Sequence, residues 1–183
     1  MNPTPIHRQD CHSRIAVLSR IAIAAIASFL PYTVSGEEAL PLFTDITKQA
    51  GITFRHSVGD LELSNIVEGS GAGACVFDYN NDGWIDIYFL NGAWTPGVSD
   101  NRGRHLRGKL RNALYRNNGD GTFTDVTEEA GVGDLSFSFG ASAADIDNDG
   151  DLDLYVLNYW PNVLYRNNGD GTFTDISRSS GLD

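Results

Sequence analysis

One acidic nine-residue pattern occurs twice in the chain, at residues 78–86 and 145–153. Both copies have the form D-x-[DN]-x-D-G-x-x-D. Oxygen-bearing side chains at positions one, three, five and nine, with a glycine at position six, suit Ca²⁺, which takes several oxygen ligands around a sharp turn. The alternative is a plain Asp/Asn/Gly turn without a metal, but such a turn needs far fewer carboxylates, and these repel one another without a cation.

The pattern predicts two calcium sites, in which the residue at position seven offers its backbone carbonyl. The predicted ligands of the first site are Asp78, Asn80, Asp82, Trp84 and Asp86, and those of the second are Asp145, Asp147, Asp149, Asp151 and Asp153. Four acidic side-chain ligands in the second loop, against three in the first, predict that the second site binds Ca²⁺ more tightly.

The sequence around each loop excludes an EF-hand. Position twelve, where an EF-hand needs a glutamate, is Phe89 in the first copy and Val156 in the second. The flanking runs are short and rich in small, aliphatic and aromatic residues, which is typical of buried strands. These runs are residues 71–77, 85–90, 139–144 and 152–157. Each loop is therefore predicted to join two strands.

The repeated unit is longer than the loop. Residues 112–127 recur as residues 162–177, and further strands are predicted at 113–116, 122–126, 163–166 and 172–176. Asn-Gly-Asp-Gly between the last two strands of each unit indicates a hairpin turn, with an ion-binding turn as the alternative. Four strands repeated every 40–50 residues are typical of a propeller blade. The first unit carries an additional 17 residues between its second and third strands.

These motifs resemble the FG-GAP/VCBS repeat family, the calcium-bearing blades of integrin-alpha-like β-propellers. Phe139-Gly140 stands at the family's Phe-Gly element, and the phrase LYRNNGDGTFTDVTEEAGV at 114–132 is most similar to the N-terminal part of ASPIC/UnbV (cartilage acidic protein-like) proteins. The resemblance implies an all-β, partial β-propeller with two four-stranded blades, and both loops as structural Ca²⁺ sites. Phe43–Thr47, which matches a fourth strand, is expected to be an N-terminal closing strand.

The expected organisation has four parts: a signal peptide at 1–36, a strand and lead-in at 37–65, a first blade at 66–132 with a basic insertion at about 95–111, and a second blade at 133–183. Such propellers usually have seven blades, so we expect a truncated piece of a longer protein. The alternative is a short chain that assembles with copies of itself, because two blades alone leave an apolar face uncovered.

The N-terminal residues indicate export. Three arginines precede an apolar run at 21–30, and small residues at 34–36 offer a cleavage site, as in a secretory signal peptide. An uncleaved anchor is the alternative. We expect a secreted protein, extracellular or periplasmic, with no transmembrane segment once the leader is removed. The formal net charge of −11 argues against nucleic acid and anionic membranes as partners.

Two loops are candidates for binding a protein or glycan. Their candidate residues are Trp94, Arg102, Arg104, Arg107 and Trp160, from the basic insertion and the equivalent loop of the second unit. A basic loop on an acidic protein attracts anionic groups, and exposed tryptophans stack on sugars or on a protein surface. The alternatives are a solvated loop and tryptophans that pack against their own blades.

An enzyme is the less favoured interpretation. After the leader, the chain has two histidines, His56 and His105, and it has no nucleophile-elbow, zinc-protease or phosphate-loop motif. His56 is a candidate ligand or base, with a structural histidine as the alternative. We expect no catalysis by this chain, and the alternative is a piece of a larger propeller hydrolase or lyase whose catalytic residues lie outside it.

Overall fold

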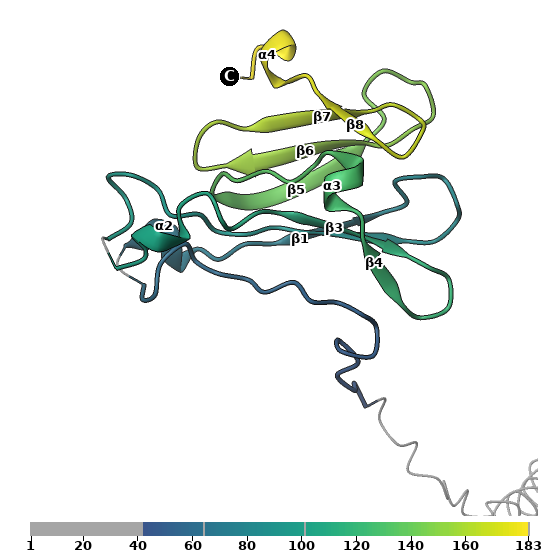
Figure 1. Cartoon of the computed structure of the whole chain (residues 1–183). Coiled ribbons are helices and arrows are strands. Elements are labelled where there is room, and N and C mark those ends of the chain that lie inside the picture. Colours follow the sequence, from purple (N-terminus) through teal and green to yellow (C-terminus); the bar gives the residue numbers. More distant parts are fainter. Residues whose placement is uncertain (1–41, 64, 101, 183) are drawn as a thin grey trace, which may run out of the picture. The chain divides into compact units, whose positions relative to one another are not determined.

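The computed structural model describes residues 42–63, 65–100 and 102–182 (Figure 1). The predicted leader, residues 1–36, lies outside the described residues. Residues 44–183 form one compact unit, and the description below concerns that unit alone. Its helices, within the described ranges, are short, and none is long and apolar enough to cross a bilayer.

The unit contains two four-stranded antiparallel sheets. The first has the order β1 (Ala74–Phe77), β2 (Asp86–Phe89), β3 (Ala113–Asn117) and β4 (Phe123–Asp125). The second has the order β5 (Ser138–Ala144), β6 (Asp153–Asn158), β7 (Val163–Asn167) and β8 (Phe173–Asp175). Each strand pairs with its neighbour in sequence, which is the up-and-down order of a propeller blade. The prediction of an all-β chain with two four-stranded blades is confirmed.

The hydrophobic core lies where the two sheets face each other, and β1 and β5 are in contact at one edge of it (Figure 1). Tyr88 and Leu114 from the first sheet and Leu154 and Val156 from the second are completely buried. Burying a side chain of this size stabilises the fold by about 1.5–3 kcal/mol. The Tyr88 hydroxyl also donates to the Val132 carbonyl at 2.8 Å, so the phenol keeps a hydrogen bond inside the core.

A short helical turn follows the last strand of each sheet. These turns are α3 (Thr127–Ala130) and α4 (Ser177–Ser180), and neither was predicted from the sequence. In α3, Asp125 Oδ1 accepts hydrogen bonds from the Thr127 amide at 3.0 Å and from its hydroxyl at 2.5 Å. Gly131 then ends the turn with φ +76°, a left-handed conformation that favours glycine.

The predicted closing strand at Phe43–Thr47 is wrong. Residues 42–46 have no regular secondary structure, and residues 47–51 form a turn. Gly51 has φ +76°, as Gly131 does, and the Ala50 carbonyl accepts a hydrogen bond from the Phe123 amide at 2.8 Å. Among the described residues no strand pairs with residues 43–47, and the one backbone contact to β4 is made by the turn. The sequence match therefore corresponds to the turn at the end of a blade and not to its last strand.

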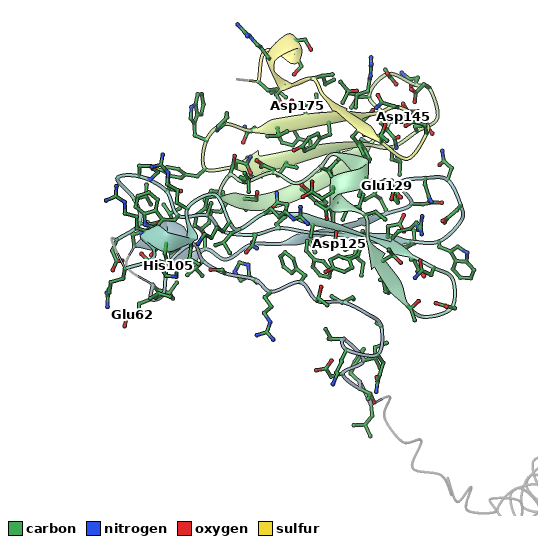
Figure 2. The ribbon with its side chains drawn as sticks, viewed as in Figure 1. Glu62, His105, Asp125, Glu129, Asp145 and Asp175 are labelled. Atoms are coloured by element: carbon green, nitrogen blue, oxygen red, sulfur yellow. The ribbon has the colours of Figure 1, made fainter. Side chains whose placement is uncertain are left out.

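A buried polar network joins the sheets at the end opposite the acidic loops. Asn112 Nδ2 donates to Ser138 Oγ at 2.8 Å, Ser138 Oγ donates to Asn158 Oδ1 at 2.7 Å, and Asn112 Oδ1 accepts from the Asn91 amide at 2.7 Å. All four residues are buried. Because buried polar groups must be hydrogen-bonded, this chain of contacts fixes one blade against the other. The short helix α2 (Ile66–Gly69) lies at the same end (Figure 1), as does η1 (Arg104–Leu106), whose His105 is labelled in Figure 2.

Candidate metal centre

Three carboxylates converge in the loop between β5 and β6. Asp145, Asp147 and Asp149 each offer an oxygen, and these atoms all lie within 4.8 Å of one another. Figure 2 shows Asp145 at the end of the second sheet where this loop projects. Desolvation and then the neighbouring carboxylates, Asp149 first, raise the pKa of Asp147. Such crowding of like charges is relieved when a cation binds between them.

The first aspartate of this loop fixes its turn through hydrogen bonds from two backbone amides. Asp145 Oδ1 accepts the Asp149 amide at 3.2 Å, and Asp145 Oδ2 accepts the Gly150 amide at 3.1 Å. Asn148 and Gly150 adopt left-handed conformations, with φ +61° and +96°. Glycine takes this conformation without strain and asparagine tolerates it, which explains both residue types at these positions.

The loop between β1 and β2 has the same geometry. Asp78 Oδ1 accepts the Asp82 amide at 3.2 Å, and Asp78 Oδ2 accepts the Gly83 amide at 2.8 Å. Asn81 and Gly83 are left-handed, with φ +57° and +87°. The two sequence copies therefore fold into two copies of one structure, each at the same end of its sheet.

Asn80 supplies the observation in the first loop that best fits a cation. Its Oδ1 atom is buried and has no hydrogen-bond partner among the residues that the structure describes, although its Nδ2 donates to Asp82 Oδ2 at 2.9 Å. A buried acceptor without a donor costs stability unless something else satisfies it. An oxygen-ligated cation between Asp78, Asn80 and Asp82 would satisfy this atom, so the residues of the first loop fit the predicted Ca²⁺.

Position nine has a structural role that the sequence analysis missed. Asp86 is fully buried, and its two oxygens accept the Tyr79 amide at 3.0 Å and the Asn117 amide at 2.7 Å. Burial raises the pKa of Asp86, the two amides lower it, and the Asp82 and Asp78 carboxylates raise it again. Asp86 thus fastens the start of the loop to the end of β3.

Asp153 repeats this arrangement in the second blade. It is 2% exposed, and its oxygens accept the Ile146 amide at 2.9 Å and the Asn167 amide at 2.8 Å. It lies outside the group of three converging carboxylates. Coordination by Asp86 and Asp153 stays a prediction, while their amide contacts are a feature of the fold itself.

The structure also brings the two loops together, which the sequence did not predict. Asn81 Nδ2 donates to Asp151 Oδ1 at 2.6 Å, across 70 residues of chain. Nearby, Asn167 Nδ2 donates to the Tyr79 carbonyl at 2.8 Å. Asn81 and Tyr79 stand at variable positions of the pattern, so no signal in the sequence marked them. The candidate centre is therefore a pair of adjoining loops.

The basic insertion lies at the other end of the sheets, where Figure 2 shows Glu62 and His105 far from Asp145. Arg102 forms ion pairs with Asp100 and with Glu62, both at 2.8 Å. The Arg107 guanidinium lies 5.8 Å from the centre of the Trp94 ring. Two of the three arginines predicted for a ligand loop, Arg102 and Arg107, thus already contact groups of the protein. All three arginines are exposed.

The two tryptophans in equivalent loops differ in their surroundings. Trp94 is partly buried, and its indole Nε1 donates to the Asp100 carbonyl at 2.6 Å. Trp160 is 73% exposed. Trp94 thus packs against its own loop, as the alternative in the sequence analysis expected. Of the two, Trp160 is the one whose ring is open to solvent.

Both repeated units match one known protein family. The model of the FG-GAP-like repeat matches residues 78–156 and again residues 145–182, so the two matches begin at the two acidic loops. A search of curated proteins found no match. FG-GAP repeats are propeller modules that generally bind ligands and are typical of extracellular proteins. From the repeated loops, the two sheets and this match, the chain belongs to the FG-GAP-like repeat family.

Proposed function

We propose that this chain is a secreted, calcium-binding propeller module that binds a protein or glycan, and that two Ca²⁺ ions stabilise it. The observation that carries the calcium proposal is the convergence of Asp145, Asp147 and Asp149 within 4.8 Å. The buried, unpartnered Asn80 Oδ1 supports a second ion in the first loop. Hard oxygen ligands in a flexible turn favour Ca²⁺ over metals that prefer sulfur or nitrogen.

The proposed role of the ions is structural. Each would neutralise crowded carboxylates and hold the turn that connects the first two strands of a blade. Because Asn81 and Asp151 join the loops, an ion in either loop would also support the contact between blades. No catalytic step is assigned to these ions.

Calorimetric titration of the metal-free chain with CaCl₂ tests this proposal, with MgCl₂ as the matched control. We expect two binding events with dissociation constants in the millimolar range or below, and weaker binding of Mg²⁺, which requires a tighter octahedral shell. The absence of any Ca²⁺ binding at millimolar concentration would contradict the proposal.

Export is part of the same proposal. Weak calcium sites, with dissociation constants of about 10⁻⁴–10⁻³ M, fill in calcium-rich extracellular fluid. The apolar run with its basic flank at the N-terminus supports a cleaved leader. Expression of the whole chain, followed by N-terminal sequencing of the exported product, tests this. A start at Glu37 is expected, and retention of Met1 on a membrane-bound product would indicate an anchor instead.

We further propose that the chain is related to the N-terminal part of ASPIC/UnbV proteins, because the sequence of residues 114–132 is similar to theirs. Ligand binding through the loops that carry Trp94 and Trp160 is tested with protein and glycan arrays. Because Trp160 is the more exposed ring, Trp160→Ala should remove an array signal more completely than Trp94→Ala does. A signal that survives both variants and deletion of 99–110 would place the ligand elsewhere.

Catalysis by this chain is not part of the proposal. The alternative of a propeller hydrolase or lyase is not favoured, since the proposed cation and the backbone amides would account for the aspartates of the loops. His56 is exposed. Incubation of the purified chain with a panel of polysaccharides should give no new reducing ends or unsaturated products, and turnover would overturn this part of the proposal.

A further inference from the structure

An open hollow of about 340 Å³ lies beside the first acidic loop, and it is lined by Asn80, Asp82, Trp84, Arg116, Asn117 and Asn118. Its volume falls in the range of small-molecule sites, about 300–1,000 Å³. The lining combines one aromatic ring, one guanidinium and the oxygens of a candidate cation loop. A calcium site alone would use neither the Trp84 ring nor the Arg116 guanidinium.

The aromatic ring is held in place from beneath. The Trp84 side chain is 52% exposed, and it rests on the hairpin turn of the same blade. A Cβ atom on Gly119 would lie 2.8 Å from indole Cε2, so only glycine permits this approach, and Gly119 also has φ +75°. The indole is therefore a supported platform with an open surface, the type of surface on which the apolar face of a sugar ring stacks.

The Arg116 guanidinium lines the same hollow and supplies a positive charge there. Arg116 is half-buried and lies beside the Tyr79 phenol, whose pKa is raised by burial and lowered by this arginine. Within the part of the chain that the structure describes, Arg116 forms no ion pair with a carboxylate. A planar guanidinium pairs well with a carboxylate group, which it contacts through two parallel hydrogen bonds.

The amides of the hollow are already in use. Asn117 Nδ2 donates to the Ile85 carbonyl at 3.1 Å, and Asn118 Nδ2 donates to Thr122 Oγ1 at 2.9 Å. The groups left to meet a ligand are the Trp84 ring, the Arg116 guanidinium and the cation that the loop would hold. The ring and the guanidinium suit a sugar that carries a carboxylate, because the five predicted ligands of the first loop are fewer than the six to eight oxygens that Ca²⁺ takes and leave a coordination position for that carboxylate.

The second blade lacks this combination. Asp151 stands where Trp84 does, bonds to Asn81, and lies close to Gly169, whose Cβ would be 2.7 Å from Asp151 Oδ2. Asp151 offers no stacking surface, and it adds a carboxylate to a loop that already has four acidic predicted ligands, although Arg166 repeats Arg116. The site is therefore expected in the first blade alone.

We propose that the hollow between Trp84 and Arg116 binds a uronic-acid unit of a saccharide, whose ring stacks on Trp84 and whose carboxylate meets Arg116 and the cation of the first loop. The assignment deepens the proposed function, because it rests on Ca²⁺ in that loop. The hollow is a second candidate ligand site, at the acidic-loop end of the first blade and apart from the loops that carry Trp94 and Trp160.

Calorimetric titration of the calcium-loaded chain with a galacturonic-acid trisaccharide tests the assignment, with the neutral galactose trisaccharide as the matched ligand. We expect measurable binding of the acidic sugar and at least about tenfold weaker binding of the neutral one. Trp84→Ala and Arg116→Gln should each weaken the acidic sugar about tenfold. Tyr159→Ala, which changes an exposed aromatic residue outside the hollow, should leave the sugar affinity unchanged.

Calcium titrations of the same variants separate this assignment from the proposed function. Trp84→Ala keeps the backbone carbonyl, so its Ca²⁺ affinity should stay within about twofold of the parent chain. Normal Ca²⁺ binding without sugar binding, or sugar binding that both variants retain, would overturn the saccharide site and leave the calcium module standing. Binding of an aspartate-containing tripeptide in preference to the sugar would also overturn it. A chain that binds no Ca²⁺ fails the proposed function at the earlier titration.

Discussion

The two acidic loops have nearly the same backbone and different side chains. Both use the first aspartate to hold two amides and the ninth to clamp the following hairpin. They differ at position three, Asn80 against Asp147, and at position seven, Trp84 against Asp151. The shared positions build the loop, and the variable ones decide its charge and its neighbours. Duplication of one fold thus leaves room for two chemical roles.

The largest expected effect comes from a position that the loops share. Asp86→Ala and Asp153→Ala each leave two amides without their acceptor, so we expect each to lower the free energy of unfolding by about 3 kcal/mol. Urea denaturation in excess chelator measures this without Ca²⁺. If these residues act as metal ligands alone, the variants would equal the parent chain under those conditions.

Counted per site, chelation should have the next largest effect. Ca²⁺ at about 100 times its dissociation constant stabilises the folded state by about 2.7 kcal/mol per site, provided that the unfolded chain does not bind it. Removal by EGTA should therefore lower Tm by several degrees, and added CaCl₂ should restore it. Differential scanning calorimetry at two Ca²⁺ concentrations checks this, and a Tm independent of both additions would count against structural ions.

The third prediction separates the two loops by charge. Asp149→Ala removes a carboxylate from the group of three, whereas Asn80→Ala removes a neutral oxygen. We expect Asp149→Ala to lower the Ca²⁺ affinity of the second site about tenfold more than Asn80→Ala lowers that of the first. Calcium titration of both variants gives the comparison. A greater loss for Asn80→Ala would mean that the buried amide oxygen, and not the charge count, dominates affinity.

The smallest expected effect tests the contact between loops. Asn81→Ala removes the hydrogen bond to Asp151 and places alanine at positive φ, while Asn148→Ala shares only the backbone cost, with φ +61° against +57°. The difference in unfolding free energy between these variants should be about 1 kcal/mol. Asn81→Ala should also weaken Ca²⁺ in the second loop, where Asp151 stands. Equal effects in both variants would show that the loops act independently.

The sequence predicted the strands well because their repeats are short, apolar and bounded by Asp, Asn and Gly. All eight predicted strands of the two blades form, and their predicted and observed ends differ by a few residues, most at β1. The exception is Phe43–Thr47, whose sequence matches a fourth strand but which pairs with no strand among the described residues. A strand needs a partner for its backbone, and local sequence does not provide one.

The sequence by itself determined the fold class, the place of the two loops and the three carboxylates that converge in the second, because periodicity and loop spacing are local properties of the chain. Only the tertiary structure decided that Asn81 meets Asp151, that Asp86 and Asp153 are buried clamps, and that Trp84 and Arg116 share one hollow. These contacts join residues from different strands and blades. They exist only after burial of the common core has brought the elements together.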